Sequence, residues 1–452
     1  MSRTRFIKGT YTKVSQKGHS MYSNENIVTT ATKTVTEEGS DQGISYGDPE
    51  KPKEGNIQSK CLVEFRPHAN WSGEFGFDWV RLGDTGVSGD KKWYKSIIGN
   101  YRNPSTKLLE QIYLNGVFFK DGKEYQSLLN KFSNMTIPWK PKINGSPYLY
   151  PIPYMTIYKG DSHKLTLKID IEELPEKLTI KHLKKPQDTK EYFKFNKEEI
   201  SIKKGKYTLD NYLEITCVNS FSTDQIIEVL ADDKVCGKIK ILANNTAHQK
   251  QGKILFVSVK SSSGPGKIKN GSTAGEKERL IKYLRQAYIN ADIKSINLDL
   301  TKDRNFIPKL QSGIGIHQYL DSKLRSAKFP DGSVLGNKYD SFYRVYFIAE
   351  VIQLPDGQYL LGEAENIPSK TVYVLDLKNI ATTTGNPFEA VKTTATHELL
   401  HAIGLFHTFD NRSPLTFKKF NTDNIMDYYI SDTNIKAKQT YKWQWDILKS
   451  KI

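Results

Sequence analysis

Cysteine is scarce in this sequence. Three cysteines, Cys61, Cys217 and Cys236, are spread over 452 residues, which is too few for the disulfide framework of a small secreted domain. We expect three free, buried thiols, with a Cys217–Cys236 bridge as the alternative. Because no two cysteines stand close together, a metal site in this chain would have to be built from histidine, of which there are nine.

Long apolar runs are also absent. No stretch approaches the ~20 apolar residues that a membrane-spanning helix needs, so no membrane span is expected. The opening segment MSRTRFIKGTYTKVSQ has basic residues but lacks the apolar core of ~7–15 residues that a cleavable secretory signal requires. These absences predict a protein that is made in the cytoplasm without a signal peptide, and whose export would need a non-classical route.

Positive charge is in excess. The formal net charge is +16 and the isoelectric point is about 9.3, which would suit anionic partners. However, the lysines are mixed with acids, as in KHLKKPQDTKEYFKFNKEEISIKKGK, and no nucleic-acid-binding motif is present. A solvated basic surface is therefore the preferred interpretation, and nucleic-acid binding is a weaker alternative.

The chain is too long for one ordinary core, and its pattern divides it into three regions. Residues 1–150 begin with a polar, turn-rich segment. Short aromatic runs broken by glycine follow, as in CLVEFRPHANWSGEFGFDWVRLGDTG, and they predict a β-rich docking or export region. The proline-rich segment 137–153 is a candidate boundary.

Residues 151–245 show the period of two that is typical of half-buried strands. KLTLKIDI alternates apolar and polar residues, and YLEITCV, IIEVLA and GKIKIL repeat the alternation. ADDKVCG, between the last two, predicts a hairpin turn. This region is predicted to be a small, immunoglobulin-like antiparallel β-sandwich, followed by a polar linker at 244–253.

Residues 250–452 alternate strands with helices. Amphipathic helices are predicted at 275–291 and 316–327. This order is typical of an α/β layer with helices packed on a sheet. Strands are predicted at 254–260, 295–300, 342–352 and 371–377.

The segment THELLHAIGLFHTF, residues 396–409, contains the candidate metal ligands and the candidate general base. His397 and His401 are four residues apart on a predicted helix, so they project from the same face and can bind one zinc ion. Glu398 is rotated by about 100° from His397. That rotation places its carboxylate beside the metal, where it can accept a proton from the water that zinc activates.

Both ends of this helix are marked in the sequence. Asn386 can cap its start, Pro387 suits the first helical position, and Glu389 completes an Asn-x-x-Glu capping arrangement. Gly404 tolerates a positive φ and can end the helix in a sharp turn. His407 would then swing back as the third ligand, since catalytic zinc usually has three protein ligands and a water.

The pattern HExxHxxGxxH, followed by Met426 in NTDNIMDYYISD, resembles that of the metzincin zinc peptidases. The endings HTF and MDY are most similar to the pappalysin-like branch. The resemblance implies that Met426 forms an apolar floor beneath the metal, and that Tyr428 binds the metal or stabilises the oxyanion. It also implies a last helix at TYKWQWDILKS, with Trp443 and Trp445 in the core.

The chain departs from that branch between the zinc helix and the methionine. Pappalysins usually carry cysteines and a calcium site there, whereas DNRSPLTFKKFNTDN is short and has no cysteine. Calcium dependence and substrate preference are therefore not carried over from the resemblance.

The rest of the chain resembles Bacteroidota proteins associated with type VI secretion. The resemblance lies in CLVEFRPHANWSGEFGFDWVRLGDTG, in YPIPYMTIY and in a sandwich that precedes a zinc peptidase. It implies loading from the cytosol, export by a contractile, type VI-like route, and contact with components of the secretion apparatus.

The sequence thus predicts a multidomain chain with β-rich N-terminal regions and a C-terminal α/β zincin domain of metzincin type. We expect a zinc-dependent endopeptidase that acts on protein or peptide as a secreted or injected effector. His397, His401 and His407 would hold Zn²⁺, and Glu398 and Tyr428 would be catalytic. The alternatives are a zinc amide hydrolase that acts on the cell envelope, and an injected structural or adhesive protein with a vestigial zincin module.

Overall fold

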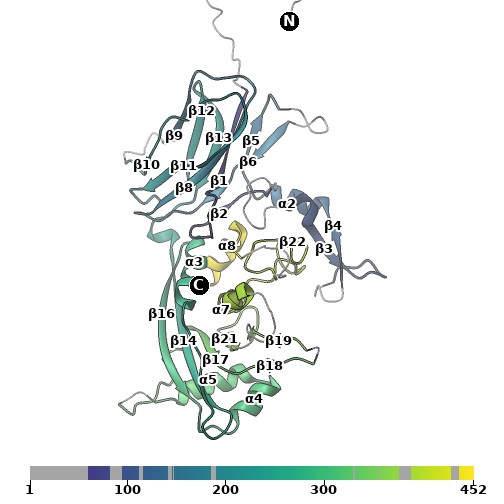
Figure 1. Cartoon of the computed structure of the whole chain (residues 1–452), viewed down its shortest axis with the longest axis vertical. Coiled ribbons are helices and arrows are strands. Elements are labelled where there is room, and N and C mark those ends of the chain that lie inside the picture. Colours follow the sequence, from purple (N-terminus) through teal and green to yellow (C-terminus); the bar gives the residue numbers. More distant parts are fainter. Residues whose placement is uncertain are drawn as a thin grey trace, which may run out of the picture. The chain divides into compact units, whose positions relative to one another are not determined.

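The computed structural model describes most of the chain from residue 60 onward (Figure 1). Residues 59–452 form one compact unit. The polar segment predicted as a loop at the start of the chain lies outside the described residues. Among the described helices, none is long and apolar enough to cross a membrane. The described residues are 60–81, 94–110, 116–140, 145, 147–184, 190–328, 331–355, 357–375, 388–428 and 437–452.

Two β-sheets enclose an apolar core and form a β-sandwich. Side chains such as Val63, Leu167 and Ile227 lie between the sheets and are fully buried. The first sheet contains β1 (Cys61–Pro67), β8 (Ser162–Ile171), β11 (Gly205–Cys217) and β10 (Phe193–Phe195), in that order. The second sheet contains β2 (Phe77–Asp78), β7 (Tyr154–Met155), β13 (Lys234–Ile241), β12 (Gln225–Ala231) and β9 (Leu178–His182).

The strands predicted from alternation are all present in this sandwich. Asp232 and Asp233 between β12 and β13 both have positive φ, at 47° and 65°, as a tight hairpin turn requires. Strand pairing also crosses the boundary predicted near residue 150, because β1 pairs with β8 and β2 pairs with β7. The immunoglobulin-like assignment stays a prediction.

The proline-rich segment that suggested a boundary forms a hairpin with the strand before it. β5 (Asn134–Ile137) pairs with β6 (Tyr148–Pro151) in an antiparallel arrangement. The buried residues of this hairpin, among them Ile137 and Tyr150, cluster with Leu62 of β1. Leu62 alternates with Cys61 and Val63, which face the sandwich core, so this hairpin covers the opposite face of β1.

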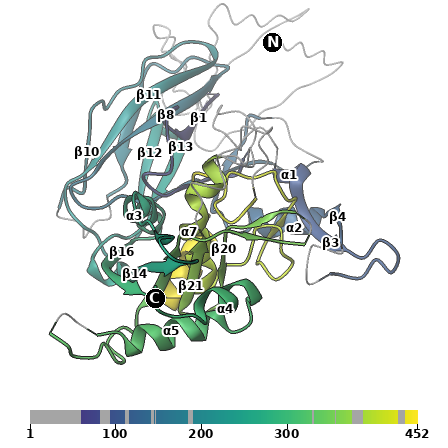
Figure 2. The same ribbon diagram turned by 60° about the horizontal axis from the view of Figure 1, so that its bottom comes forward.

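A six-stranded, mainly parallel sheet forms the centre of the C-terminal half (Figure 2). Four strands are parallel to one another, and β15 and β20 run antiparallel to their neighbours. The strands are β14 (Lys250–Ser262), β15 (Ile268–Asn270), β16 (Ile289–Asp299), β17 (Tyr343–Ile348), β20 (Gly362–Ala364) and β21 (Thr371–Leu375). A separate short hairpin joins β18 (Ile352–Gln353) to β19 (Tyr359–Leu360).

Helices cover both faces of this sheet. Phe256 and Val345 pack with buried residues of α3 (Glu276–Gln286), α7 (Phe388–Ile403) and α8 (Lys442–Lys451). Neighbouring strand residues, such as Leu255 and Tyr346, pack on the other face with α4 (Phe306–Ser312) and α5 (Ile316–Ser326). The assignment of this half to a zincin-like α/β fold stays a prediction.

Several predicted boundaries in this half were wrong, among them those of a helix and of the linker. The helix predicted to reach residue 291 ends at Gln286, because Tyr288 has a positive φ of 55° and β16 begins at Ile289. The segment 244–253 is not a simple linker. It contains a short 3₁₀ turn (Thr246–His248), its Asn244 is fully buried, and its last residues belong to β14.

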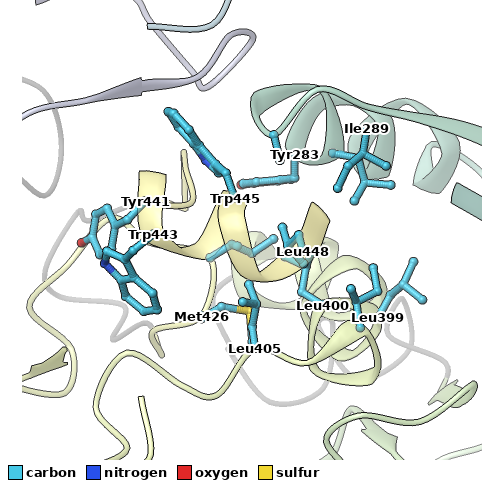
Figure 3. Packing of buried hydrophobic residues seen from close by; sticks show 14 of the residues in the cluster. Tyr283, Ile289, Leu399, Leu400, Leu405, Met426, Tyr441, Trp443, Trp445 and Leu448 are labelled. Atoms are coloured by element: carbon cyan, nitrogen blue, oxygen red, sulfur yellow. The ribbon is translucent and has the colours of Figure 1, made fainter. Parts of the chain in front are cut away.

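A small three-stranded sheet joins the N-terminal region to the C-terminal half. β3 (Ile98–Arg102) lies between β4 (Val117–Lys120) and β22 (Thr416–Phe417), and is flanked by α1 (Tyr94–Ile97) and α2 (Gly122–Leu129). Residues of α1 and α2 share one core with α7 and α8. Trp443 and Trp445 of α8 lie in that core, as predicted, and Figure 3 shows them among the side chains of the cluster to which Met426 also belongs.

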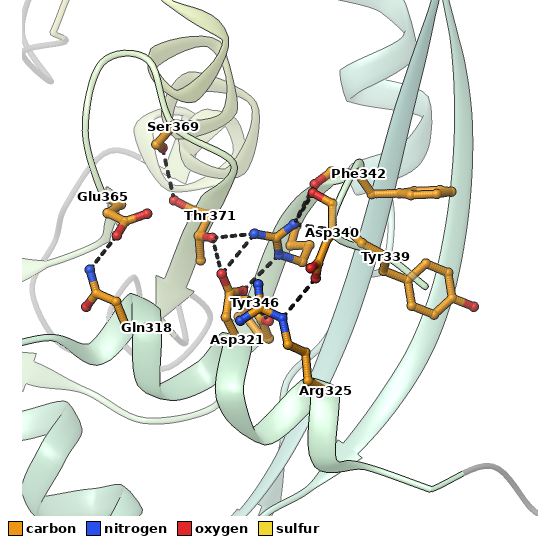
Figure 4. Close-up of polar contacts among 11 residues, drawn as sticks. Gln318, Asp321, Arg325, Tyr339, Asp340, Phe342, Tyr346, Glu365, Ser369 and Thr371 are labelled. Carbon is orange, nitrogen blue, oxygen red and sulfur yellow. Dashed lines mark hydrogen bonds and ion pairs between the residues drawn. The ribbon is translucent and has the colours of Figure 1, made fainter. Parts of the chain in front are cut away.

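A buried ion pair fastens α5 to the starts of two strands (Figure 4). The guanidinium group of Arg344 donates to both carboxylate oxygens of Asp321, at 2.8 Å each. Tyr346 and Thr371 donate hydroxyl hydrogens to the same carboxylate. Burial alone would raise the pKa of Asp321, but these hydrogen bonds hold it below its usual value. The network fixes the packing of α5 on the starts of β17 and β21.

Candidate metal centre

The helix that carries the histidine motif ends where Gly404 was predicted to end it. α7 runs to Ile403, and Gly404 has a φ of +133°. The N–H of Gly404 donates to the carbonyl of His401 and the N–H of Leu405 donates to that of Leu400, which is the bonding of a Schellman motif. The predicted capping residues Asn386 and Pro387, and the side chain of Glu389, lie outside the described residues.

The turn at Gly404 brings three imidazoles to one point. The Nε2 atoms of His397 and His401 are 3.1 Å apart, those of His401 and His407 are 3.1 Å apart, and those of His397 and His407 are 3.2 Å apart. Nitrogen ligands at ~2.0–2.1 Å around a tetrahedral zinc ion would lie about 3.3 Å from one another. In the described part of the chain, these histidines form the group that can hold a metal ion.

The backbone orients two of these imidazoles. His397 Nδ1 lies 2.7 Å from the carbonyl oxygen of Ile425, and His401 Nδ1 lies 2.6 Å from that of Leu405. A carbonyl oxygen can only accept, so both Nδ1 atoms donate, and in the neutral ring each Nε2 keeps a lone pair for a metal. Burial lowers the pKa of His397 to about 4, which keeps this imidazole neutral at pH 7.

Glu398 follows His397 on α7 and is not part of the histidine group. Its Oε2 accepts the backbone N–H of Ala364 at 3.1 Å. Burial raises the pKa of Glu398 to about 7; the Ala364 N–H lowers it, and the neighbouring Glu363 raises it further. A carboxyl group with this pKa can both accept and return a proton near neutral pH.

The contact between Glu398 and the edge strand β20 was not predicted. A Cβ atom built on Gly362 would lie 2.9 Å from the carbonyl oxygen of Tyr373, 3.1 Å from Thr394 Cγ2 and 3.2 Å from Glu398 Cγ. Only a glycine lets the strand approach the helix this closely. The available sequence signal was a glycine within a short apolar segment, YLLGEA, which often marks a close backbone approach.

The segment that contains Met426 is hydrogen-bonded to the histidine segment. Met426 is fully buried, and its carbonyl oxygen accepts the N–H of Thr408, next to His407. The ring of Tyr428 lies 4.7 Å from the ring of His407 and 6.0 Å from that of His397. Tyr428 is 37% exposed, so it borders the centre on its solvent side.

Residues of the N-terminal region support the loop between His407 and Met426. Asn411 accepts the N–H of Tyr101 at 2.9 Å, and its amide donates to the carbonyls of Tyr101 and Glu110. The hydroxyl of Tyr101 accepts the N–H of Lys419 at 2.8 Å. No local sequence pattern pointed to these contacts, because they join segments about three hundred residues apart.

The cysteines are free and buried, as predicted. Cys217 contacts Asn219 and Asn244. Cys236 lies against Cys61, and the hydrogen bond with Cys61, together with burial, raises the pKa of the Cys236 thiol. The alternative of a Cys217–Cys236 bridge is therefore wrong.

Comparisons with known proteins give no sequence match. No family model and no curated protein matches the chain. Among solved structures, archaemetzincin from Methanopyrus kandleri matches with a TM-score of 0.27 and 17% identity, over 46% of this chain and 98% of that chain. A likeness at this level does not establish a shared fold, so the function below is inferred from the residues of the site.

Proposed function

We propose that the chain is a zinc-dependent peptidase of metzincin type, with residues 250–452 as a zincin-like catalytic domain. One observation carries the proposal: the Nε2 atoms of three buried or half-buried histidines converge within 3.1–3.2 Å, and Glu398 follows the first of them on the same helix. A helix that only packs in a core is not stabilised by three neutral imidazoles that converge, whereas a zinc ion is bound by a set of such ligands.

The residues of the centre have separate roles in the proposed reaction. Zinc held by the three histidines would supply the Lewis acidity that lowers the pKa of water and polarises a carbonyl. Glu398 would take the proton from the attacking water at its carboxylate and pass it to the leaving amine. The carbonyls of Ile425 and Leu405 hold the imidazole rings of His397 and His401 in place.

Tyr428 is proposed to stabilise the oxyanion. Its ring lies 4.7 Å from that of His407 and 4.9 Å from that of Phe409, and its partial exposure places it next to an incoming substrate. A hydroxyl in that position can donate a hydrogen bond to the oxygen on which negative charge develops.

The first test separates zinc binding from catalysis. We expect the purified chain to hold about one zinc ion and to cleave peptides in a proteome-derived library. Glu398→Gln should keep the zinc and lose about 10²–10⁴-fold in kcat/KM, because that is what a positioned general base contributes. Glu228→Gln is the control, since Glu228 is also buried but pairs with Lys238 in the sandwich.

Two outcomes would contradict this function. Full cleavage by Glu398→Gln would exclude the proposed base. A purified chain that neither contains nor takes up zinc would favour a vestigial module in a structural protein.

The finer assignments remain proposals from the sequence. The endings HTF and MDY support a pappalysin-like branch, and the resemblance to type VI-associated proteins supports export as an effector. Digestion of isolated cell walls, compared with cleavage of the peptide library, would distinguish a peptidase from an amide hydrolase of the envelope.

A further inference from the structure

We propose that Cys61 and Cys236 are a disulfide site, and that a bond between their sulfur atoms fastens strand β1 to strand β13 under oxidising conditions. The inference is independent of the proposed peptidase function, because it uses no residue of the candidate metal centre. It adds a covalent modification of the β-sandwich, between two residues that stand far apart in the sequence.

The two thiols meet in the core of the sandwich. Cys61 and Cys236 are 2% and 3% exposed and belong to the same apolar cluster. They come from different sheets, since β1 belongs to the first sheet and β13 to the second. A hydrogen bond joins the two side chains, so the sulfur atoms are in direct contact. Cys217 is also buried, but its thiol contacts Asn219 and Asn244 instead.

A β-bulge turns Cys236 toward Cys61. Ile239 of β13 faces the sandwich core, so unbroken alternation along this strand would turn Cys236 away from the core. The register between β12 and β13 shifts at Cys236, because its neighbours Val235 and Gly237 pair with consecutive residues of β12. A bulge of this kind changes the direction of a side chain. Here it places the thiol in the core, where Cys61 lies.

The backbones of the two strands come close together beside these thiols. A Cβ atom built on Gly237 would lie 2.4 Å from the carbonyl oxygen of Val63. Val63 follows Cys61 by two residues and faces the same core. Facing sheets usually pack about 10 Å apart, whereas a disulfide needs Cα atoms about 4.4–6.8 Å apart. The glycine next to Cys236 therefore allows the close approach that a disulfide requires.

The bond forms by exchange with a small-molecule disulfide such as oxidised glutathione. The thiolate of one cysteine attacks the oxidant, whose S–S bond breaks, so that one half leaves as a thiol and the other half stays on the cysteine. The thiolate of the second cysteine then attacks the sulfur of the first, and the remaining half of the oxidant leaves. Each cysteine loses one proton to a leaving group, and two electrons pass to the oxidant, which ends as two thiols.

The surroundings of the pair indicate a structural bond rather than a fast redox sensor. The hydrogen bond with Cys61 and burial raise the pKa of the Cys236 thiol, and the charge of Asp232 adds to this effect, so thiolate is scarce in the closed fold. Exchange then requires local opening at the start of β1, where Cys61 is the first residue and where, among the described strands, only β8 pairs with β1. Once formed, the bond would close residues 61–236 into one loop and restrict the unfolded chain.

The test maps the bond in the full-length chain. The purified chain is incubated with reduced or with oxidised glutathione, quenched with acid, alkylated and digested for mass spectrometry. Oxidised wild type should give a linked peptide that contains Cys61 and Cys236, while Cys217 is recovered as an alkylated thiol. The midpoint of urea unfolding should be higher by roughly 1 M in the oxidised chain than in the reduced chain.

Cys61→Ala and Cys217→Ala are a matched pair of variants, because both replace a buried thiol of the same core. Each variant is compared with itself in the two buffers, so the cost of losing the thiol cancels. Oxidation should raise the urea midpoint of Cys217→Ala as it does that of wild type, and should leave the midpoint of Cys61→Ala unchanged. If Cys61→Ala does not fold, the peptide map of wild type decides alone.

Three results would overturn the inference. The first is a wild-type chain whose Cys61 and Cys236 stay as thiols, or carry glutathione without a link between them, in a buffer that oxidises the same chain in urea. The second is a linked peptide that contains Cys217. The third is a urea midpoint that rises equally in Cys61→Ala and in wild type.

Discussion

Gly362 allows a close approach of the edge strand β20 to the helix of the candidate metal centre. A methyl group there would meet the backbone of Tyr373 at 2.9 Å and the side chains of Thr394 and Glu398 at 3.1–3.2 Å. We expect Gly362→Ala to push β20 away from α7 and to destabilise the chain by about 1–3 kcal/mol. Since Ala364 on β20 positions Glu398, kcat should also fall, while zinc content is retained.

Gly122→Ala is the control for that substitution. Gly122 begins α2, and a Cβ atom there would meet nothing within 4 Å. Urea unfolding and peptide cleavage should show no loss of either stability or activity for Gly122→Ala, because alanine is the better helix former. Equal behaviour of the two variants would contradict the close approach at Gly362.

Individual residues were predictable from the sequence where their partners are near in the chain. One helix and its end contain His397, His401, His407 and Gly404. Spacing alone therefore predicted that the three histidines converge. Gly362 was missed because the atoms it avoids belong to β21 and α7. Such packing constraints leave no periodic pattern in a single sequence.

At the scale of elements, Asn411 fastens the loop after α7 to the strand β3. Its side chain makes three hydrogen bonds to the backbone of Tyr101 and Glu110. Asn411→Ala should leave these partly buried groups without that partner, at a cost of about 1–3 kcal/mol. Because the same loop leads from His407 to Lys419, zinc affinity should fall several-fold, measured by competition with a chelator.

A matched variant in the sandwich separates stability from zinc binding. Asn196 accepts the N–H of Glu214 at 2.7 Å and donates to the carbonyl of Tyr212 at 3.1 Å, so it makes the same kind of contact far from the histidines. Asn196→Ala should lower stability but keep the zinc affinity of wild type. An unchanged zinc affinity in Asn411→Ala would show that the N-terminal region does not support the centre.

The elements that the sequence predicted are those long enough to show a period. β8, β12 and β13 alternate, and α3 and α5 carry an apolar stripe. β20 and β22 are only three and two residues long, too short for a period, and only their tertiary partners define them. For the same reason the pairing of β3 with β22 could not be foreseen.

At the scale of the whole molecule, the sandwich and the C-terminal half meet in a buried polar cluster. Asp78, at the end of β2, accepts the N–H of Lys442 at the start of α8 at 2.9 Å. Nearby, Arg81 donates to both carboxylate oxygens of Asp423. The three-region division read from the sequence does not account for this cluster, because composition shifts along a chain do not show which regions share a core.

The same cluster makes stability depend on pH. Burial raises the pKa of Asp78 from 3.8 to about 6, despite the Lys442 N–H and the charges of Arg81 and Lys442, which lower it; Asp423 raises it further. The folded chain therefore holds this proton more tightly than the unfolded chain. The free energy of unfolding should fall as pH rises from about 4 to about 6, and this contribution should level off above the folded pKa.

Asp78→Asn isolates that contribution, because the amide oxygen can still accept the Lys442 N–H but cannot ionise. Between pH 4 and 6, the free energy of unfolding of the variant relative to wild type should rise by up to about 3 kcal/mol, measured by urea unfolding of both chains in the same metal state. The variant also lacks the Asp78 charge beside Arg81. This loss shifts the difference in free energy of unfolding at every pH, but it does not change the direction in which that difference varies with pH. A difference that stays constant across this range would mean that Asp78 is already ionised in the folded chain at pH 4, and that the junction between the sandwich and α8 is a salt-bridged contact rather than a protonated one.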